Sequence, residues 1–93
     1  MSSTNYLIAD LPDTERPRER MQRLGADALS NSELLAILIR HGTRGKSALA
    51  VAADLLRAFD GSLKRLAGAQ PSELHKIPGI GTVKALELSA AFA

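Results

Sequence analysis

The sequence contains neither cysteine nor tryptophan, and its only aromatic residues are Tyr6, Phe59 and Phe92. Without cysteine the chain cannot form a disulfide, a thiolate zinc site or a cysteine nucleophile. So few aromatic rings argue against a surface that stacks the bases of single-stranded nucleic acid. The two histidines, His41 and His75, belong to no H-E-x-x-H motif and to no cluster with the spacing of metal ligands. We therefore expect no catalytic residue, no metal site and no cofactor, and we interpret the protein as non-enzymatic.

Long apolar runs are also missing, and none approaches the roughly 18–20 residues that a membrane-spanning helix needs. Residues 1–10 carry no lysine or arginine, so the basic start of a secretory signal is absent. We expect a cytoplasmic protein without a membrane partner. With 93 residues, of which 45% are hydrophobic, the chain is long enough for one small domain and too short for two.

Charge is distributed unevenly along the chain. Residues 1–39 contain four basic and six acidic residues. Residues 40–93 contain eight basic and four acidic residues, which gives this part a formal charge of +4. The second part is therefore the more suitable surface for a polyanion.

Two helices are predicted in the first part of the chain. Pro17 suits the first position of a helix, and Gly25 is a typical residue to end it. Ser30 and Glu33 form the S-x-x-E capping box that marks the start of a second helix. Because apolar residues extend nearly all round this second helix, we expect it to be the central buried helix, with Leu38 at the centre of the core.

Further helical segments are predicted in the second part. Ser47 is the expected N-cap of a helix whose apolar positions have helical spacing; these positions are Leu49, Ala52, Leu56 and Phe59. A short helical turn over residues 63–67 leads to a brief helix from Pro71 to about Lys76. A last helix from about residue 82 is expected to bury Ala85, Leu88 and Phe92. No segment alternates with the period of a strand, so the fold class is all-α.

The segment Ile-Pro-Gly-Ile-Gly precedes the last helix. Its two glycines, Gly79 and Gly81, allow positive φ angles and let the N–H groups of the turn approach an anion closely. Ile80 is expected to point inward and anchor the turn. The positive end of the following helix, with Thr82 and Lys84, would complete a phosphate pocket. The alternative is a tight turn between two helices that binds no ligand.

A second glycine-containing loop, residues 42–47, carries Arg44 and Lys46. It is not a P-loop, because only two residues, instead of four, separate its first glycine from its Gly-Lys-Ser. It also follows a helix, whereas a P-loop follows a strand. A shift of the sequence by 37 positions superimposes four identical residues of the two glycine regions. The pairs are Gly42 and Gly79, Ala48 and Ala85, Leu49 and Leu86, and Ala53 and Ala90. We interpret the first region as a degenerate hairpin in which Arg44 and Lys46 flank a second phosphate position; the alternative is an ordinary exposed basic loop.

Several segments together carry a family resemblance. They are Glu15–Arg20, Ala28–Ser30, Glu33–Arg40, Gly42-Thr43, Gly45–Ser47, Leu55-Leu56, Ile77, Gly79–Gly81 and Lys84-Ala85. From about residue 11 to the end, the chain resembles the N-terminal domain of the bacterial RadC family, and its glycine turn is similar to a helix-hairpin-helix motif. The resemblance implies a helical domain followed by a JAMM-type metallopeptidase-like domain. The His-x-His and Ser-x-x-Asp zinc motif of that second domain is absent here, so neither zinc nor hydrolysis is carried over.

The sequence thus predicts a flexible tail over residues 1–12 and a compact domain of about five or six helices over residues 13–93. The domain is expected to be SAM-like or helix-hairpin-helix-like, with the hairpin at about residues 71–93. Our first functional hypothesis is a non-catalytic module that binds duplex or structured DNA without sequence preference, a role that the RadC resemblance associates with DNA repair. Its phosphate-binding residues would be Gly79, Ile80, Gly81, Thr82 and Lys84, with Arg44 and Lys46 in addition. The alternative is a protein-interaction module that positions or regulates the JAMM-type domain of the same protein.

Overall fold

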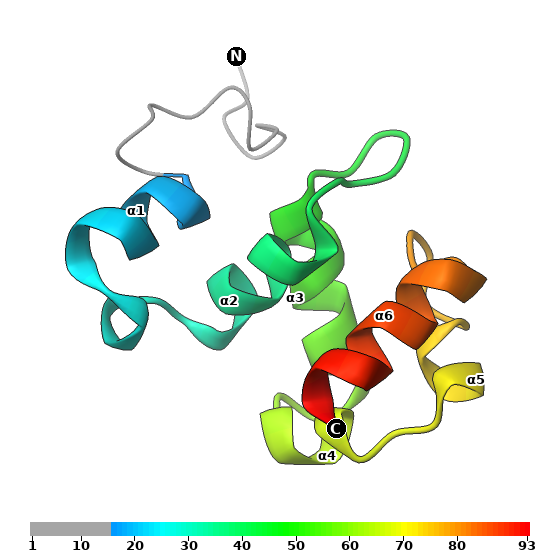
Figure 1. The fold of residues 1–93 in the computed structure, drawn as a ribbon. Helices are drawn as coiled ribbons and strands as arrows, with labels where there is room; N and C mark the ends of the chain where they lie inside the picture. Colours follow the sequence, from blue (N-terminus) through cyan, green and yellow to red (C-terminus); the bar gives the residue numbers. More distant parts are fainter. Residues whose placement is uncertain (1–15) are drawn as a thin grey trace.

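The computed structural model describes residues 16–93 and shows them as an assembly of helices (Figure 1). The helices are α1 (Pro17–Leu24), the 3-10 helix η3 (Ala26–Ala28), α2 (Asn31–Ile39), α3 (Ala48–Ala58), α4 (Leu63–Ala67), α5 (Pro71–Leu74) and α6 (Thr82–Phe92). The expected all-α fold is therefore confirmed for this part of the chain. The expected tail, residues 1–12, lies outside the described residues.

Serine caps fix the starts of three helices. Ser30 Oγ accepts a hydrogen bond from the Glu33 N–H at 3.2 Å, and Glu33 Oε1 accepts one from the Ser30 N–H at 2.9 Å. This reciprocal pair is the capping box predicted for α2. Ser47 and Ser62 cap α3 and α4 by accepting hydrogen bonds from the N–H groups three residues later, at 3.0 and 3.1 Å. Pro17 occupies the first turn of α1, as predicted.

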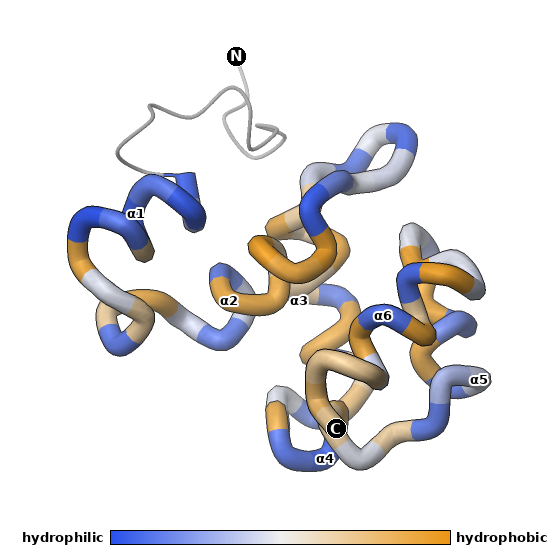
Figure 2. The backbone as a smooth tube through the Cα atoms, in the orientation of Figure 1, coloured by the Kyte–Doolittle hydropathy of each residue, from blue (hydrophilic) through white to orange (hydrophobic). Residues whose placement is uncertain are grey.

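The hydrophobic core lies between α2, α3 and the α5–α6 pair. α2 packs mainly against α3, and α5 packs against α6. Figure 2 shows apolar residues concentrated on these inner segments, while α1 is largely hydrophilic. The core consists of Leu35, Ala36, Ile39, Ala48, Val51, Ala52, Leu55, Leu66, Leu74, Ile80, Ala85 and Leu88. Distant parts of the sequence therefore share one core.

The expectation that α2 is the central buried helix, with Leu38 at the centre of the core, is wrong. Leu38 is 41% exposed, whereas its neighbour Ile39 is fully buried. Successive residues on an α-helix point about 100° apart, so only one side of α2 can face α3. That side carries Leu35, Ala36 and Ile39. An apolar residue on every face of α2 does not reveal which face the neighbouring helix covers.

The central helix is instead α3, and its fully buried positions differ from three of the four apolar positions that indicated this helix. Val51, Ala52 and Leu55 are fully inaccessible and Ala48 is nearly so. Of the four predicted positions only Ala52 is fully buried, while the other three lie at the margin of the core. The spacing of residues 48, 51, 52 and 55 is helical as well, and the small side chains at 48 and 52 let other elements approach α3 closely.

The α5–α6 pair follows the prediction with small differences. α5 ends at Leu74, two residues before Lys76, the expected end. In α6 both Ala85 and Leu88 are 1% exposed, as predicted, and Phe92 is only partly buried. The last helix is thus held mainly by its first two turns.

Ile80 should contribute strongly to stability because its side chain is 2% exposed. We expect Ile80→Ala to lower the free energy of unfolding by about 2–5 kcal/mol, since it removes buried methyl groups and leaves a cavity. Val83→Ala is the control, because Val83 is 70% exposed, and it should change the stability by less than about 0.5 kcal/mol. Urea unfolding followed by far-UV circular dichroism measures both. Equal losses would contradict the role of Ile80 as an anchor.

Candidate functional site

The turn between α5 and α6, residues 75–81, is seated on the core by Gly79 and Ile80. Gly79 has a φ of +96°, and a Cβ built on it would lie 3.0 and 3.1 Å from the two γ-methyl carbons of Val51. Both the backbone angle and the close approach therefore require glycine here. Ile80 points inward, and its N–H donates to the Ile77 carbonyl at 2.9 Å. The predicted anchor is confirmed.

Gly81 differs from the prediction, because its conformation does not need glycine. Its φ is −76° and its ψ is 178°, and no heavy atom lies within 4 Å of the place where its Cβ would be. Gly81 is the N-cap of α6, and no side chain caps this helix. Gly81 has no side chain to place over the first N–H groups of α6, and both Gly81 and the following Thr82 are exposed.

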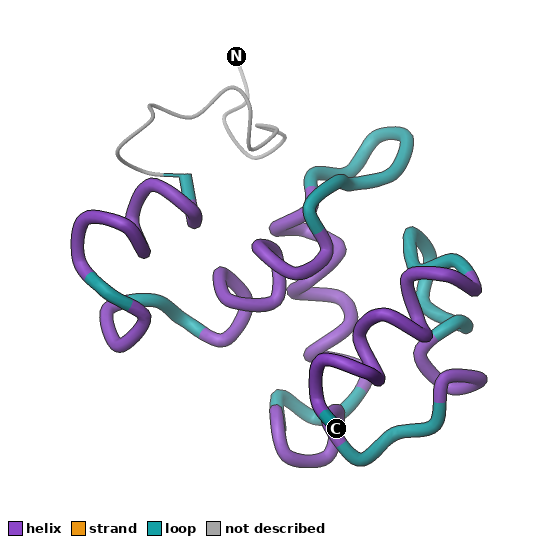
Figure 3. The backbone as a smooth tube through the Cα atoms, in the orientation of Figure 1, coloured by secondary structure: helices purple, strands orange, loops and turns teal. Residues whose placement is uncertain are grey.

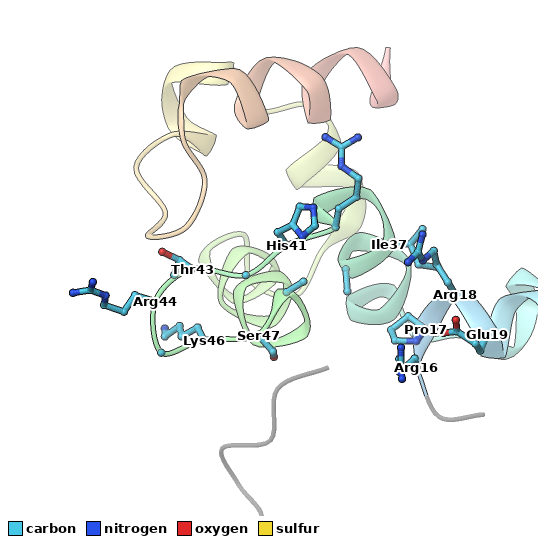
Figure 4. Close-up of a pocket in the computed structure, with 15 residues that line it drawn as sticks. Arg16, Pro17, Arg18, Glu19, Ile37, His41, Thr43, Arg44, Lys46 and Ser47 are labelled. Carbon is cyan, nitrogen blue, oxygen red and sulfur yellow. The ribbon is translucent and has the colours of Figure 1, made fainter. Parts of the chain in front are cut away.

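The loop between α2 and α3, residues 40–47, adjoins this turn; Figure 3 shows both as loop segments that join helices. Thr43 and Lys46 exchange two backbone hydrogen bonds, of 3.0 and 2.9 Å, which close the loop. At Gly42 a Cβ would lie 1.9 Å from the Lys46 carbonyl oxygen, so the loop can close only around a glycine. Thr43 Cγ2 lies 3.4 Å from the position of a Cβ on Gly79. The structure thus brings the two predicted glycine regions side by side, as Figure 4 also shows near Thr43.

The two regions are nevertheless not repeats of one hairpin. Residues 40–47 separate α2 from α3, whereas residues 75–81 separate α5 from α6. The shift of 37 positions places the exposed Thr43 on the buried Ile80, so the first loop lacks a hydrophobic anchor. Ala48 and Ala85 are both buried and agree with the shift. The described structure therefore supports two adjoining loops and gives no support for a degenerate tandem pair.

The basic residues of this surface are mostly engaged with carboxylates. Lys84, predicted to reach a phosphate, has a side chain that is only 18% exposed, and its Nζ lies 3.1 Å from Glu87 Oε1. A guanidinium nitrogen of Arg40 lies 3.2 Å from the same oxygen. The hydrogen bond from Lys84, followed by the charges of Lys84 and Arg40, holds the pKa of Glu87 below its ordinary value. Sequence reasoning missed Arg40, because its partner is 47 positions away.

Lys46 and Arg44 differ in whether they pair with a carboxylate. Lys46 forms an ion pair with Asp54, which also pairs with Arg57 at 2.9 Å. The hydrogen bond from Lys46, more than that from Arg57, holds the pKa of Asp54 below its ordinary value. Arg44 is exposed and has no ion pair or hydrogen bond with the described residues. In Figure 4 its side chain extends away from the loop.

A groove of about 700 Å³ separates the α2–α3 loop from the start of α1 (Figure 4). Its apolar wall includes Pro17, Ala36, Ile37 and Ala48. Its charged rim consists of Arg16, Arg18, Glu19, Arg40, Arg44 and Lys46. The groove therefore extends the basic surface of the loop towards α1.

Neither histidine is grouped with acidic side chains as a metal site would require, although His41 lines the groove among basic residues. His41 and His75 are both exposed, and His75 Nδ1 lies 3.2 Å from the Ile80 carbonyl oxygen. Among residues 16–93 no three histidine or acidic side chains are grouped as metal ligands. None of the helices in the same range is long and apolar enough to cross a membrane.

These features define a small all-α domain with an anchored turn at the start of its last helix and a basic loop beside it. A family model described as UPF0758 N-terminal matches residues 8–86. The chain belongs to the UPF0758 family, as its N-terminal domain, and this confirms the RadC-like resemblance of the sequence.

Relatives in several bacteria are similar to almost the whole chain. A UPF0758 protein of Bacillus velezensis is 55% identical over 84 residues, which are 90% of this chain and 36% of the relative. One of Shouchella clausii is 56% identical over 91% of this chain, and one of Trichlorobacter lovleyi is 47% identical over 96%. The chain spans only about 36–40% of the length of these relatives. No solved structure matches the chain.

The cluster of Arg40, Lys84 and Glu87 predicts a specific pH dependence. Lys84→Ala should return the pKa of Glu87 towards its ordinary value, and Arg40→Ala should do so less, because the hydrogen bond from Lys84 is the larger cause. Since folding lowers this pKa, the ion pair stabilises the domain above the unfolded pKa and is lost as the pH falls through the folded pKa. An NMR titration of the Glu87 carboxyl carbon measures the effect. An unchanged pKa in the Lys84 variant would contradict the assignment.

Proposed function

We propose that this domain binds DNA through phosphate contacts, without sequence preference and without catalysis. In this proposal α5, residues 75–81 and α6 act as a helix-hairpin-helix. The observation that carries the proposal is the open N-terminus of α6 at Gly81, beside the basic loop. Contacts confined to phosphate groups hold a duplex without reading its bases.

The uncapped start of α6 supports a phosphate contact. Ser30, Ser47 and Ser62 each accept a hydrogen bond from one N–H group in the first turn of α2, α3 and α4. Gly81, the N-cap of α6, offers no such side chain, and α1 likewise starts without a side-chain cap. Free N–H groups at a helix N-terminus point at an anion, and the helix dipole favours negative charge there. A missing Cβ that the backbone conformation does not require is explained if a phosphate needs the space.

The charges near the turn support the same proposal. Arg44 is free to pair with a phosphate, and it lies on the loop that contacts Gly79 through Thr43. Arg40 and Lys84 hold one carboxylate between them, so this cluster keeps a net charge of +1. Because Glu87 is exposed, a phosphate can compete with its carboxylate for both cations. Lys84 would then contribute by exchanging partners and not as a free cation.

Titration of the domain with short duplexes of different sequence, at several salt concentrations, tests the proposal. About two to four phosphate contacts predict a log–log salt slope of about −2 to −4 and a dissociation constant of roughly 10⁻⁴–10⁻⁵ M. Gly81→Ala should keep the fold, because its Cβ meets no atom, and should weaken binding roughly tenfold by covering the N–H groups, which corresponds to about 1.4 kcal/mol.

Gly68→Ala is the matched control. Gly68 ends α4, and a Cβ there makes only ordinary contacts, at 3.7 Å and beyond. This variant should bind DNA as tightly as the unchanged chain. Equal affinities of the Gly81 and Gly68 variants would exclude the turn as the phosphate site. No binding of any duplex at low salt and millimolar protein would exclude the DNA-binding function, and the protein-interaction alternative would replace it.

Glu87→Gln should strengthen DNA binding, because it releases Arg40 and Lys84 and removes one negative charge from the surface. The salt slope should become steeper by about one. Asp60→Asn is the control with the same change of charge: Asp60 pairs with Arg65 beyond the far end of α3, and asparagine tolerates its positive φ. The 11 residues of α3 separate Asp60 from the basic α2–α3 loop by about 16 Å. This separation exceeds the Debye length of about 10 Å at 0.1 M salt, so the loop is screened from a change of charge at Asp60. A gain of the same size in both variants would show that net charge alone matters.

A further inference from the structure

The outer face of α6 is apolar and uncovered. Val83 is 70% exposed and Leu86 is 55% exposed, whereas Ala85 and Leu88 on the opposite side are 1% exposed. Ala90, four residues after Leu86, is exposed as well. Residues 83, 86 and 90 lie on one side of a helix. We call Val83, Leu86 and Ala90 the α6 face.

A shallow hollow continues the α6 face towards α5. It has a volume of about 120 Å³. Its walls are formed by Pro71, Ser72, His75, Thr82, Ala85 and Leu86. A hollow of this size beside exposed aliphatic side chains can receive a single apolar side chain of a partner. The α6 face therefore offers a partner a recess to fill in addition to its apolar side chains.

We propose that the α6 face is the docking surface for the polypeptide region that follows this domain in UPF0758 proteins. The relatives are longer than this chain, which spans about 36–40% of them. Their matching part is described as N-terminal, so the remaining length follows it. The described residues end just after α6, and residues 83–90 of that helix lie within about 16 Å of its C-terminal end, which is within reach of a region that follows this domain.

The size of the α6 face favours a partner within the same polypeptide over a second copy of the chain. Stable complexes of separate proteins bury about 800 Å² on each partner. Two exposed aliphatic side chains and one alanine offer much less. A region linked directly to α6 faces an effective concentration in the millimolar range, so a small apolar contact is sufficient to hold it. This proposal does not depend on DNA binding.

The test uses a full-length UPF0758 protein that contains this domain, with labelled valine, leucine and methionine methyl groups. A neutral gadolinium chelate in solution broadens the NMR signals of exposed methyl groups. The methyl signals of Val83 and Leu86 should lose most of this broadening because the following region covers them. Met21 and Leu24 on α1 are the internal reference, since they are 40% and 48% exposed and lie outside the α6 face; they should remain broadened.

A variant pair completes the experiment. Leu86→Asp should release the domain from the following region, so that ¹⁵N relaxation of its backbone amides reports faster tumbling of the domain. Leu24→Asp should leave the tumbling of the domain unchanged. Both residues are exposed, and the undisturbed methyl signal of the buried Leu88 verifies that each variant is folded. Three results would overturn the proposal: Val83 and Leu86 as accessible as Leu24, unchanged tumbling of the Leu86 variant, or protection that disappears on dilution together with a halving of the mass. The last would assign the face to a second copy.

Discussion

The arrangement of the candidate site depends on the contact between Gly79 and Val51. The backbone of Gly79 passes so close to Val51 that a Cβ would lie 3.0 Å from a methyl carbon. Val51 is fully buried in α3, the central helix, so the turn before α6 rests directly on the hydrophobic core. The same approach places Thr43 beside the turn. Two loops far apart in sequence thus become one surface because a single side chain is missing.

Local signals in the sequence predicted most of the helices, and long-range packing explains where they failed. The capping box of Ser30 and Glu33 involves atoms within one helical turn, so the sequence reveals it directly. The orientation of Leu38 depends instead on which side of α2 the helix α3 covers. A helix with apolar residues on nearly all sides does not encode that choice, and the prediction for Leu38, which is exposed, failed for this reason.

The candidate site was predicted in position more accurately than in detail. The turn, its anchor Ile80 and the adjoining basic loop lie where the sequence indicated. The pairing of Lys84 with Glu87 is local, since the two residues are three positions apart on α6, and the sequence indicates it. The contact of Arg40 with Glu87 was not predictable, because it forms only through the packing of α2 against α6. Gly81 shows a further limit: its residue type suggested a backbone requirement, and its φ of −76° shows none. Only the three-dimensional surroundings separate a glycine needed for folding from one that leaves a surface open.

The two proposals place different partners on one helix, and this has an energetic consequence. DNA would contact the N-terminus of α6, and the following region would contact its outer face. Leu86 is adjacent in sequence to Glu87, so docking on Leu86 would reduce the solvent around the Arg40–Glu87–Lys84 cluster and strengthen its ion pairs. A phosphate would then compete less well for the two cations. Because coupling between two binding events is reciprocal, DNA would weaken the docking by the same factor. The short distance along α6 therefore makes release of the docked region on DNA binding the expected direction of coupling.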